Sequence, residues 1–464
     1  MRKQFLFVLL TLSSLLLCSP TVAHAQWEPD VRLTYSDSSS WTCANNSNFI
    51  AACGDTVYIV WTERRDAGHN KIYLKRSTNG GSTWESDNPI TGDSATPLPP
   101  CIAVEGSFIH VVWQDWRDGP LKRIYYKRST NGGTTWEPDR RIENDTTSSE
   151  YPSVAAAGPY VHVVWHDVKR DTLRFRPDLR YCHSTNGGAS WDTVIRLTED
   201  RASSLFPSIA TFQGSVHITW LDDGRVLYKR STDQGASWSP DTALASKGTN
   251  TRPLSIAASD SNIHIIWDKN ARLCYLRSTN NGSQWKPETL LTNYSSLTPS
   301  ITASGPNVHL AWHGHPNGPC AICYKHSTDW GTSWCSDESL SASPAPGNPS
   351  IVVSGLKVHL AWNDYRHGNN EMYFKRNLTG NSGTVTAEER GQRLEVRLKA
   401  TPNPFTTFAI VPGQEKETFE LYDIAGRKVG TYRGDRIGEG QAAGVYFLRL
   451  QDYLNPPMRV VKVR

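Results

Sequence analysis

Acidic, basic and imidazole side chains follow a recurring tryptophan at seven places in the chain. These segments are TERRDAG (62–68), QDWRDG (114–119), HDVKRD (166–171), LDDGR (221–225), DKNAR (268–272), HGHPNG (313–318) and NDYRHG (363–368). Carboxylates and histidines transfer protons, and arginine holds a carboxylate with two parallel hydrogen bonds. If these segments meet round one opening, that opening would be able to bind or hydrolyse a sugar.

The third of these segments is unusually long and basic. HDVKRDTLRFRPDLR (166–180) carries Lys169, Arg170, Arg174, Arg176 and Arg180. The segments of the fourth and fifth repeats are much shorter, so they predict a lowered rim. A basic projection beside a low rim would receive an anionic or carbohydrate ligand. The alternative is a solvated charged loop without a ligand.

A structural role competes with ligand binding for these residues, because catalysis needs one of each group rather than seven. The candidate ligand-binding residues are Asp115, Trp116, Arg117, Asp167, Arg170, Arg174, Arg176, Asp222, Asp364 and Arg366. Within this set, Asp115 with Arg117 and Asp364 with Arg366 have the spacing of local turn pairs. We predict no catalytic residue, no metal ligand and no cofactor.

The tryptophans that position these segments belong to a long internal repeat. Seven alternating strands end in Trp61, Trp113, Trp165, Trp220, Trp267, Trp312 and Trp362, and most carry a histidine in a Val-His-Val type pattern. Those histidines recur at one strand position, so we expect them to pack in the core. Each unit of about 50 residues holds four short strands, which is typical of a β-propeller.

An octapeptide of the form S-x-[D/N]-x-G-x-[S/T]-W follows six of the seven strands. Its copies start at residues 77, 129, 184, 231, 278 and 327, and the fifth has Gln284 at the Ser/Thr position. The Asp or Asn side chain suits a turn, and glycine supplies a positive φ. Four copies carry Asn, which argues against calcium loops that need anionic oxygens.

The seventh unit lacks an octapeptide and an outer strand, whereas the chain has a spare strand near its start. WEPDVRLT (27–34) matches WEPDRRIE (136–143), the segment that ends one octapeptide and follows it. We therefore predict that 27–34 pairs with 371–376 and closes the ring, which removes exposed strand edges. The predicted fold is all-β, with a seven-bladed propeller and a six-bladed one as the alternative.

The octapeptide resembles the Asp-box of the sialidase (BNR-repeat) family. That resemblance implies a propeller with its site on the face opposite the boxes. It also implies three arginines on the sugar carboxylate, a Tyr–Glu nucleophile pair and an acid/base Asp. The family's Arg-Ile-Pro motif is absent, with Arg32-Leu33-Thr34 the nearest match, and no arginine triad can be mapped. We predict little or no sialidase activity.

Both ends of the chain indicate export. Residues 1–25 combine Arg2 and Lys3, an apolar run and Ala23-His24-Ala25, as a signal peptide does. The propeller is predicted over 26–376, a polar linker over 377–394 and a small Ig-like β-sandwich over 395–464.

The terminal segment resembles the sorting domain of the type IX secretion system. The resemblance rests on Pro402-Asn403-Pro404, Tyr422-Asp423 with Gly426-Arg427, and Gly444-Val445-Tyr446. It implies that residues 395–464 contact that secretion machinery, and that the protein passes through the periplasm to the outer cell surface or is secreted. An ordinary Ig-like adhesive module is the alternative.

Composition narrows the function further. A net charge of +4 over 464 residues gives no broad basic field for nucleic acid, and no later stretch is apolar enough to span a membrane. The cysteines permit disulfides whose pairing is open, and Cys320-Ala-Ile-Cys323 suits a disulfide or two free thiols. The predicted function is binding of a glycan or another extracellular polymer without catalysis. The alternatives are a sialidase-type exo-glycosidase and a structural or adhesive surface protein.

Overall fold

A computed structural model describes most of the chain and divides it into two compact units, Met1–Gly383 and Thr384–Arg464. The described residues are 27–42, 48–65, 68–143, 147–171, 174–198, 203–246, 251–316, 318–341, 343, 345–381, 418–423, 427–433, 435–450 and 458–462. The predicted signal peptide, most of the predicted linker and the Pro402-Asn403-Pro404 motif lie outside these residues.

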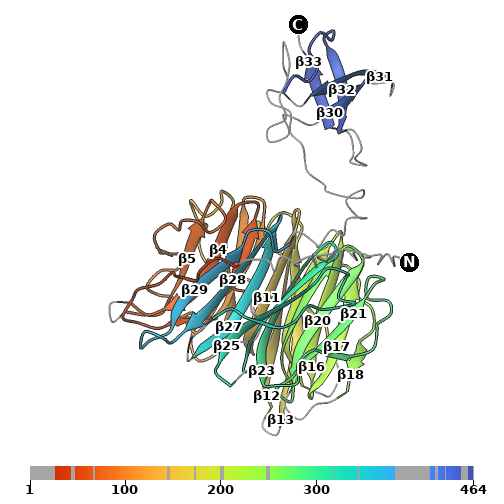
Figure 1. The fold of residues 1–464 in the computed structure, drawn as a ribbon. Helices are drawn as coiled ribbons and strands as arrows, with labels where there is room; N and C mark the ends of the chain where they lie inside the picture. The colour runs from red at the N-terminus through yellow and green to blue at the C-terminus, as the bar shows by residue number, and fades with distance from the viewer. Residues whose placement is uncertain are drawn as a thin grey trace, which may run out of the picture. The chain divides into compact units, whose positions relative to one another are not determined.

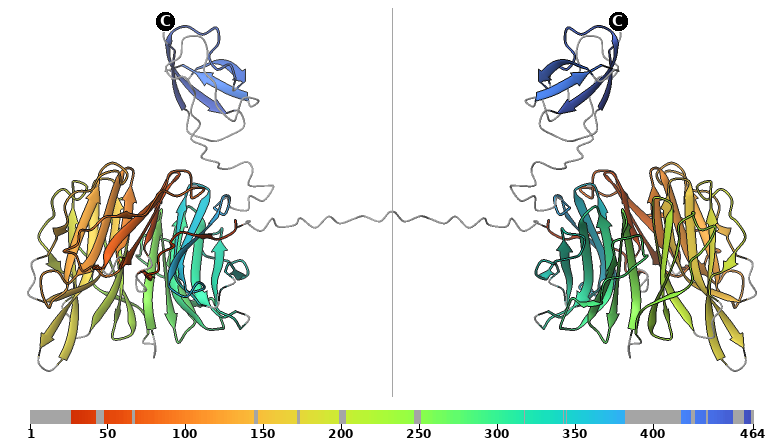
Figure 2. Two further views of the ribbon diagram at one scale, coloured as in Figure 1. Left: turned by 90° about the vertical axis from the view of Figure 1, so that its left-hand side faces the viewer. Right: turned by 90° about the vertical axis from the view of Figure 1, so that its right-hand side faces the viewer.

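The first unit is a seven-bladed β-propeller, as the repeat count predicted, and its blades are antiparallel sheets (Figures 1 and 2). Blade 1 contains β2 (Ser40–Trp41), β3 (Ile50–Cys53), β4 (Thr56–Glu63), β5 (Lys71–Ser77) and β6 (Asn88–Pro89). Blade 2 contains β7 (Cys101–Glu105), β8 (Phe108–Asp115), β9 (Arg123–Ser129) and β10 (Arg140–Arg141). Blade 3 contains β11 (Ser148–Ala157), β12 (Tyr160–Asp171), β13 (Arg174–Ser184) and β14 (Ile195–Arg196).

The remaining blades repeat the same order of strands. Blade 4 contains β15 (Ser204–Phe212), β16 (Ser215–Asp222), β17 (Arg225–Ser231) and β18 (Thr242–Ala245). Blade 5 contains β19 (Thr251–Ser259), β20 (Asn262–Lys269), β21 (Leu273–Ser278) and β22 (Thr289–Leu290). Blade 6 contains β23 (Ser296–Ser304), β24 (Asn307–Gly314), β25 (Ala321–Ser327) and β26 (Glu338–Ser339). Blade 7 contains β27 (Pro346–Ser354), β28 (Lys357–Asp364), β29 (Glu371–Asn377) and β1 (Val31–Arg32).

Blade 7 is completed by the N-terminal strand, which confirms the predicted closure. Val31 pairs with Phe374, and Trp27 forms a bridge with Asn377. Trp27 also meets Tyr324 of blade 6 edge to face, with ring centroids 4.9 Å apart. In Figure 1 the first blade (red) and the last (blue) lie beside each other. Antiparallel pairing of the two ends of the repeat array leaves no open sheet edge between them.

Each octapeptide folds into a turn held by its own side chains. In the first copy, Ser77 Oγ donates to Asn79 Oδ1 (2.9 Å) and accepts from Gly81 N (2.8 Å), while Thr83 N donates to Asn79 Oδ1 (2.9 Å). The same contacts recur in the other copies, whether the third residue is Asn or Asp. The side-chain oxygens therefore serve the turn, as the sequence predicted.

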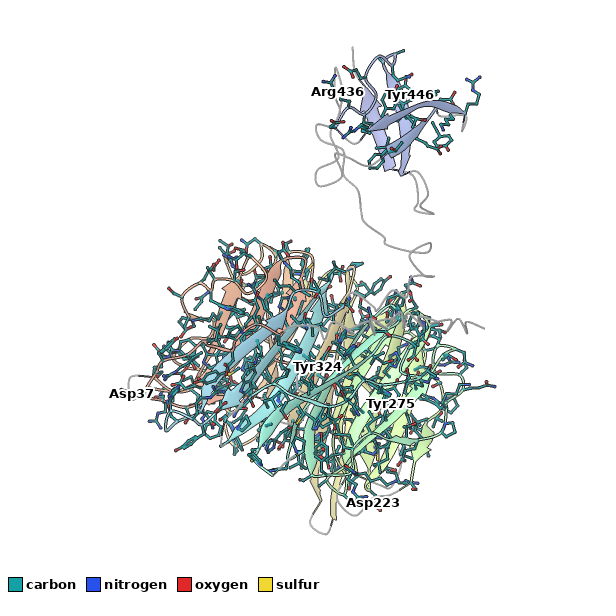
Figure 3. The ribbon with its side chains drawn as sticks, in the orientation of Figure 1. Asp37, Asp223, Tyr275, Tyr324, Arg436 and Tyr446 are labelled. Atoms are coloured by element: carbon teal, nitrogen blue, oxygen red, sulfur yellow. The ribbon has the colours of Figure 1, made fainter. Side chains whose placement is uncertain are left out.

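Neighbouring blades are joined by a tyrosine that fits against an octapeptide glycine. A Cβ on Gly188 of blade 3 would lie 1.8 Å from the hydroxyl oxygen of Tyr126 in blade 2. The Tyr126 ring meets Trp191 edge to face at 4.8 Å, and Arg128 Nη1 donates to Gly187 O at 2.7 Å. A Cβ at Gly235, Gly282 or Gly331 would overlap the hydroxyl of the preceding blade's tyrosine in the same way, so these positions need glycine. Tyr275 and Tyr324 lie within the body of the propeller in Figure 3, but blade 7 has Asn381 at the glycine position next to Tyr324's blade.

The recurring histidines are neutral core residues, as predicted. His110 is fully buried, its Nδ1 lies 2.8 Å from Tyr126 Oη, and burial lowers its pKa to about 3. His162, His217 and His264 share this arrangement and the same lowered pKa. Desolvation of the imidazolium form accounts for the lowered values.

The second unit contains one antiparallel sheet in its described residues. Its strands are β30 (Thr418–Tyr422), β31 (Lys428–Arg433), β32 (Gly444–Leu450) and β33 (Met458–Lys462), in the order β31-β30-β32-β33. The second sheet of an Ig-like sandwich does not occur in this described part, so that sandwich stays a prediction. No helix able to cross a membrane is found in the residues described for either unit.

Closure by Trp27 predicts a large stability effect for one substitution. Trp27→Ala should lower the free energy of unfolding of the propeller by about 3 kcal/mol, because an aromatic anchor between blades 6 and 7 is lost. Urea unfolding followed by Trp fluorescence measures this. Trp41→Ala, which removes an indole that is 53% exposed, is the matched control. Equal stability of the two variants would contradict closure through Trp27.

Candidate functional site: the loop face of blades 7, 1 and 2

The loops that follow the tryptophan strands lie on one face of the propeller, here called the mouth face. A carboxylate stands two residues after the tryptophan in blades 1, 2, 3, 4 and 7, and in blades 1, 2 and 7 it accepts a hydrogen bond from that tryptophan. Trp61 Nε1 donates to Glu63 (2.7 Å), Trp113 Nε1 to Asp115 (2.8 Å) and Trp362 Nε1 to Asp364 (3.1 Å). All three carboxylates are fully buried, so each needs further partners to remain charged.

An arginine two residues further on supplies the countercharge. In blade 2, Arg117 Nη2 lies 2.6 Å from Asp115 and Nη1 lies 2.7 Å from Asp139. Its guanidinium group also covers the Tyr125 ring at 4.2 Å. Arg65 joins Glu63 to Asp87, and Arg366 joins Asp364 to Asp30, in the same way. Each arginine thus fastens its mouth loop to the outer segment of its own blade.

Hydrogen bonds keep the carboxylates of Asp115 and Asp364 ionised. Burial by itself would raise the pKa of Asp115, but hydrogen bonds from Arg117, Trp113 and Thr96 hold that pKa below its usual value. Asp364 behaves likewise, with Arg366, Ser343 and Trp362 as its donors. A carboxylate with a lowered pKa and occupied oxygens is a poor proton donor at neutral pH.

The other two predicted carboxylates are also paired within their blades. Asp167 accepts from Arg180 Nε at 2.9 Å, and Asp222 pairs with Arg225. Both are fully buried. The local pairs Asp115–Arg117 and Asp364–Arg366 that the spacing predicted are present. Ligand binding by any of these residues stays a prediction.

The basic loop of blade 3 is a tall β-hairpin. β12 and β13 continue past the ends of the other blades, with Lys169 opposite Arg176 and Arg170 opposite Phe175. The ends of β12 and β13 project below the neighbouring strands in Figure 1. The side chains of Arg170, Arg174 and Arg176 lie outside the described part, so their predicted role in binding stays a prediction.

Four exposed aromatic side chains belong to the segments at the mouth-face ends of blades 7, 1 and 2. Trp116 (42% exposed) and Tyr365 (52%) each directly follow a buried carboxylate of the mouth loops. Trp41 pairs with Thr62 at the end of β4, and Tyr35 precedes it in the chain. Exposed aromatic rings in such a group mark a binding surface more often than scattered single ones do.

A groove of about 660 Å³ lies between β1 and the outer segment of blade 1, and one of the four rings, Tyr35, lines it. Its lining includes Arg32, Tyr35, Arg65, Lys75 and Asp87. The guanidinium carbon of Arg32 lies 4.6 Å from the centre of the Tyr35 ring. Two segments that are distant in the chain, joined by ring closure, therefore build one polar groove with an aromatic edge.

Sequence reasoning found only one of these four rings. Trp116 was among the predicted residues, whereas Tyr35, Trp41 and Tyr365 were missed. Two signals were available: Trp41 and Trp116 lie outside the repeat pattern of tryptophans, and Tyr365 occupies in blade 7 the position of Trp116 in blade 2.

Comparisons with known proteins find limited similarity at the level of sequence. No family model matches the chain. A stretch of 101 residues is 24% identical to human Rho GTPase-activating protein 27, covering 22% of this chain and 11% of that protein. The chain therefore spans a small fraction of that relative's length.

Solved structures are similar at the level of the fold. An ulvan lyase, a polysaccharide lyase, has a TM-score of 0.50 at 13% identity and covers 74% of this chain and 95% of its own. A Hadza microbial sialidase has a TM-score of 0.43 at 14% identity, covering 70% and 74%. An intramolecular trans-sialidase from Ruminococcus gnavus has a TM-score of 0.43 at 12% identity, covering 77% and 96%.

The buried ion pairs predict that mouth carboxylates affect stability. Asp115→Asn should lower the free energy of unfolding by about 3 kcal/mol, because it leaves Arg117 without a buried countercharge. Since the folded pKa of Asp115 is lowered, its stabilising effect is present above about pH 4 and is lost as the pH falls below that. Chemical unfolding at pH 7 and pH 3 measures both effects. Asp37→Asn, at an exposed carboxylate, is the control. A fully stable Asp115→Asn variant would favour a functional role for this carboxylate.

Proposed function

We propose that the protein is a secreted or surface-attached propeller that binds a glycan, or another extracellular polymer of similar chemistry, without cleaving it. The observation that carries this proposal is the set of four exposed aromatic side chains at the mouth-face ends of blades 7, 1 and 2, of which Tyr35 lines the groove. Sugar rings present an apolar face and a polar rim. Tyr and Trp, which are apolar with one polar tip, suit such a ligand.

The charges round the groove favour a neutral or weakly acidic glycan. Three cations, Arg32, Arg65 and Lys75, stand against three carboxylates, Glu63, Asp87 and Glu371. Because each cation already has a carboxylate partner, a polyanion would have to displace those pairs. Hydroxyl groups can instead accept from the outward N–H groups without breaking them.

The ion pairs of the predicted mouth carboxylates support binding over hydrolysis. A sialidase-type reaction needs an arginine cluster, a proton donor and a nucleophile on opposite sides of the sugar. Each of the four predicted mouth carboxylates is held in an ion pair within its own blade. The likeness to sialidases and to the lyase concerns the fold, which hosts many activities. Exo-glycosidase activity and a purely adhesive role remain the alternatives.

The two ends of the chain support the proposed location. Residues 1–25 have the pattern of a signal peptide, and 395–464 resemble a type IX sorting domain. We propose that the second unit delivers the propeller through the periplasm to the outer surface or the medium.

If the glycan binds at the mouth face, removing aromatic rings from that face should weaken binding, and removing one from the opposite face should not. On a glycan array that includes acidic polysaccharides, the purified propeller should bind a neutral or weakly acidic glycan. Trp116→Ala with Tyr365→Ala should weaken that binding about tenfold or more, since each stacked ring contributes on the order of 1 kcal/mol. Phe108→Ala removes an exposed ring at the opposite end of its strand, and this control should bind like the native protein.

Two outcomes would contradict this proposal. Loss of binding in the Phe108→Ala control alone would place the site on the other face. Turnover of a fluorogenic sialoside or neutral glycoside that disappears on replacing Asp115 or Asp167 would make the protein a glycosidase.

If the second unit serves only for delivery, removing it should change where the protein is found and leave the folding of the propeller unchanged. A chain that ends at residue 394 should keep the native melting temperature of its propeller but accumulate in the periplasm of the producing cell. Cell fractionation with an antibody against the propeller measures this, and the full-length chain is the control. Unchanged surface delivery of the truncated chain would refute the sorting role.

A further inference from the structure

Blade 6 breaks the pattern of the mouth face. Where blades 1, 2, 3, 4 and 7 have a carboxylate two residues after the tryptophan, blade 6 has Gly314. Trp312 Nε1, like the equivalent nitrogen in blades 3, 4 and 5, has no partner within the described part of the chain. A Cβ at Gly314 would lie 2.8 Å from that nitrogen and 3.2 Å from Cys323 Sγ, so a larger residue does not fit. The loop thus loses its ion pair and carries a histidine on either side of the glycine.

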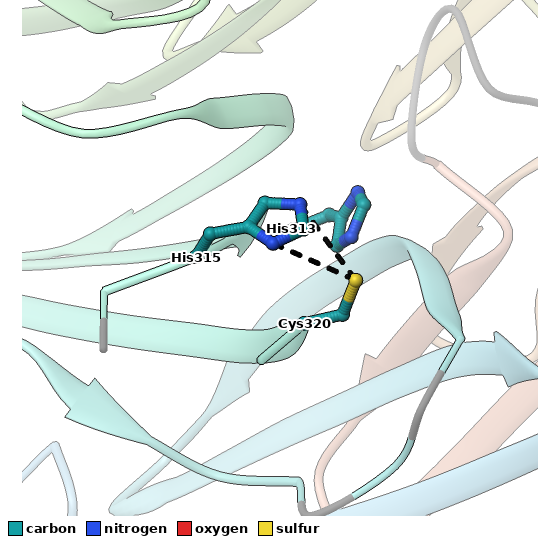
Figure 4. Close-up of side chains that lie close together, drawn as sticks. All are labelled: His313, His315 and Cys320. Atoms are coloured by element: carbon teal, nitrogen blue, oxygen red, sulfur yellow. Dashed lines mark hydrogen bonds between the residues drawn. The ribbon is translucent and has the colours of Figure 1, made fainter. Parts of the chain in front are cut away.

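Those two histidines meet a cysteine from the far side of the same loop. His313 and His315 are two residues apart at the end of β24, so strand periodicity directs them to the same side. Cys320 directly precedes β25 and places its Sγ 3.6 Å from Nδ1 and 3.7 Å from Nε2 of His315. One donor atom from each residue lies within 4.8 Å of the other two, and all three side chains are half-buried (Figure 4).

The hydrogen bonds round the cluster leave its donor atoms available. His313 Nε2 is buried and has no partner among the described residues. His315 Nδ1 lies 3.3 Å from Gly318 O, which suits donation to that carbonyl and leaves Nε2 free to bind. Metal-binding histidines commonly donate their second nitrogen to a carbonyl in this way.

We propose that His313, His315 and Cys320 bind a zinc ion. A tetrahedral centre with usual Zn–N and Zn–S bond lengths has N···S edges of about 3.6 Å, close to the separation of Cys320 Sγ from His315. Two imidazoles and a thiolate suit zinc, whereas calcium and magnesium prefer oxygen ligands. Three protein ligands leave a fourth position, as in zinc sites that bind water or a ligand oxygen.

The site uses only one of the two cysteines of the CxxC sequence. Cys323 is fully buried on β25, where its Sγ lies 3.9 Å from Ala321 O. Both are free thiols in the structure, one of the two forms that the sequence allowed. The zinc ligands therefore follow a His-x-His-x4-Cys spacing. The expectation of no metal ligand is revised by this proposal.

Metal analysis of the full chain tests the site. After loading with zinc and dialysis, elemental mass spectrometry should find about one zinc per chain in the native protein, and much less in Cys320→Ser and in His313→Ala. Cobalt in place of zinc should give visible bands of a tetrahedral centre and a near-ultraviolet thiolate charge-transfer band, which Cys320→Ser removes. Circular dichroism and melting curves establish that each variant is folded.

Cys335→Ser provides a matched control. Cys335 Sγ lies 3.2 Å from His326 Nδ1, so it forms a cysteine–histidine pair in the same blade that lacks the third ligand. This variant should keep full zinc binding. Zinc should also protect Cys320 from alkylation in the native protein, as mapped by peptide mass spectrometry. No retained zinc, or zinc lost in Cys335→Ser but kept in Cys320→Ser, would overturn the proposal.

Discussion

Four of the seven blade junctions depend on one repeated fit, in which a tyrosine hydroxyl of one blade occupies the space beside a glycine of the next. Tyr126 against Gly188 shows the constraint most plainly, because any Cβ at that glycine would overlap the hydroxyl. The same tyrosine holds a neutral histidine on one side and meets Trp191 edge to face on the other. Blade order and spacing therefore follow from a contact that only glycine permits.

Ring closure extends this rule to a blade that lacks its own octapeptide. Trp27 takes the place of the octapeptide tryptophan against Tyr324, although it comes from the other end of the repeat array. Asn381 lies where the octapeptide glycine would be and bonds to Gly355 O and His309. The N-terminal strand in turn brings Arg32 and Tyr35 beside Arg65. Ring closure therefore forms the groove, because it places β1 next to the outer segment of blade 1.

Residues that repeat from blade to blade on the mouth face have structural roles, and residues that depart from the repeat are the candidates for function. Buried carboxylates with their tryptophan and arginine partners recur in blades 1, 2 and 7, and they fasten loops to the blade. Trp116 and Tyr365 are exposed next to those fixed groups, so the rigid ion pairs hold the rings in place. In blade 6 the carboxylate is replaced by Gly314, and the loop carries His313, His315 and Cys320 instead. Rigid blades position both sets of side chains without contributing their own chemistry.

The sequence by itself determined the propeller, the number of blades, the octapeptide turns, the core histidines and the partner of the first strand. These features depend on local periodicity and on residues that repeat at fixed spacing, which a single chain displays directly. It also indicated the pairing of Asp115 with Arg117, since both lie in one short loop. Only the tertiary structure decided that Tyr35, Trp41, Trp116 and Tyr365 share one face, and that Cys320 turns toward His315 and away from Cys323. Such contacts depend on where the ends of separate strands lie in space and on how the ring closes. The repeat period of the sequence specifies neither.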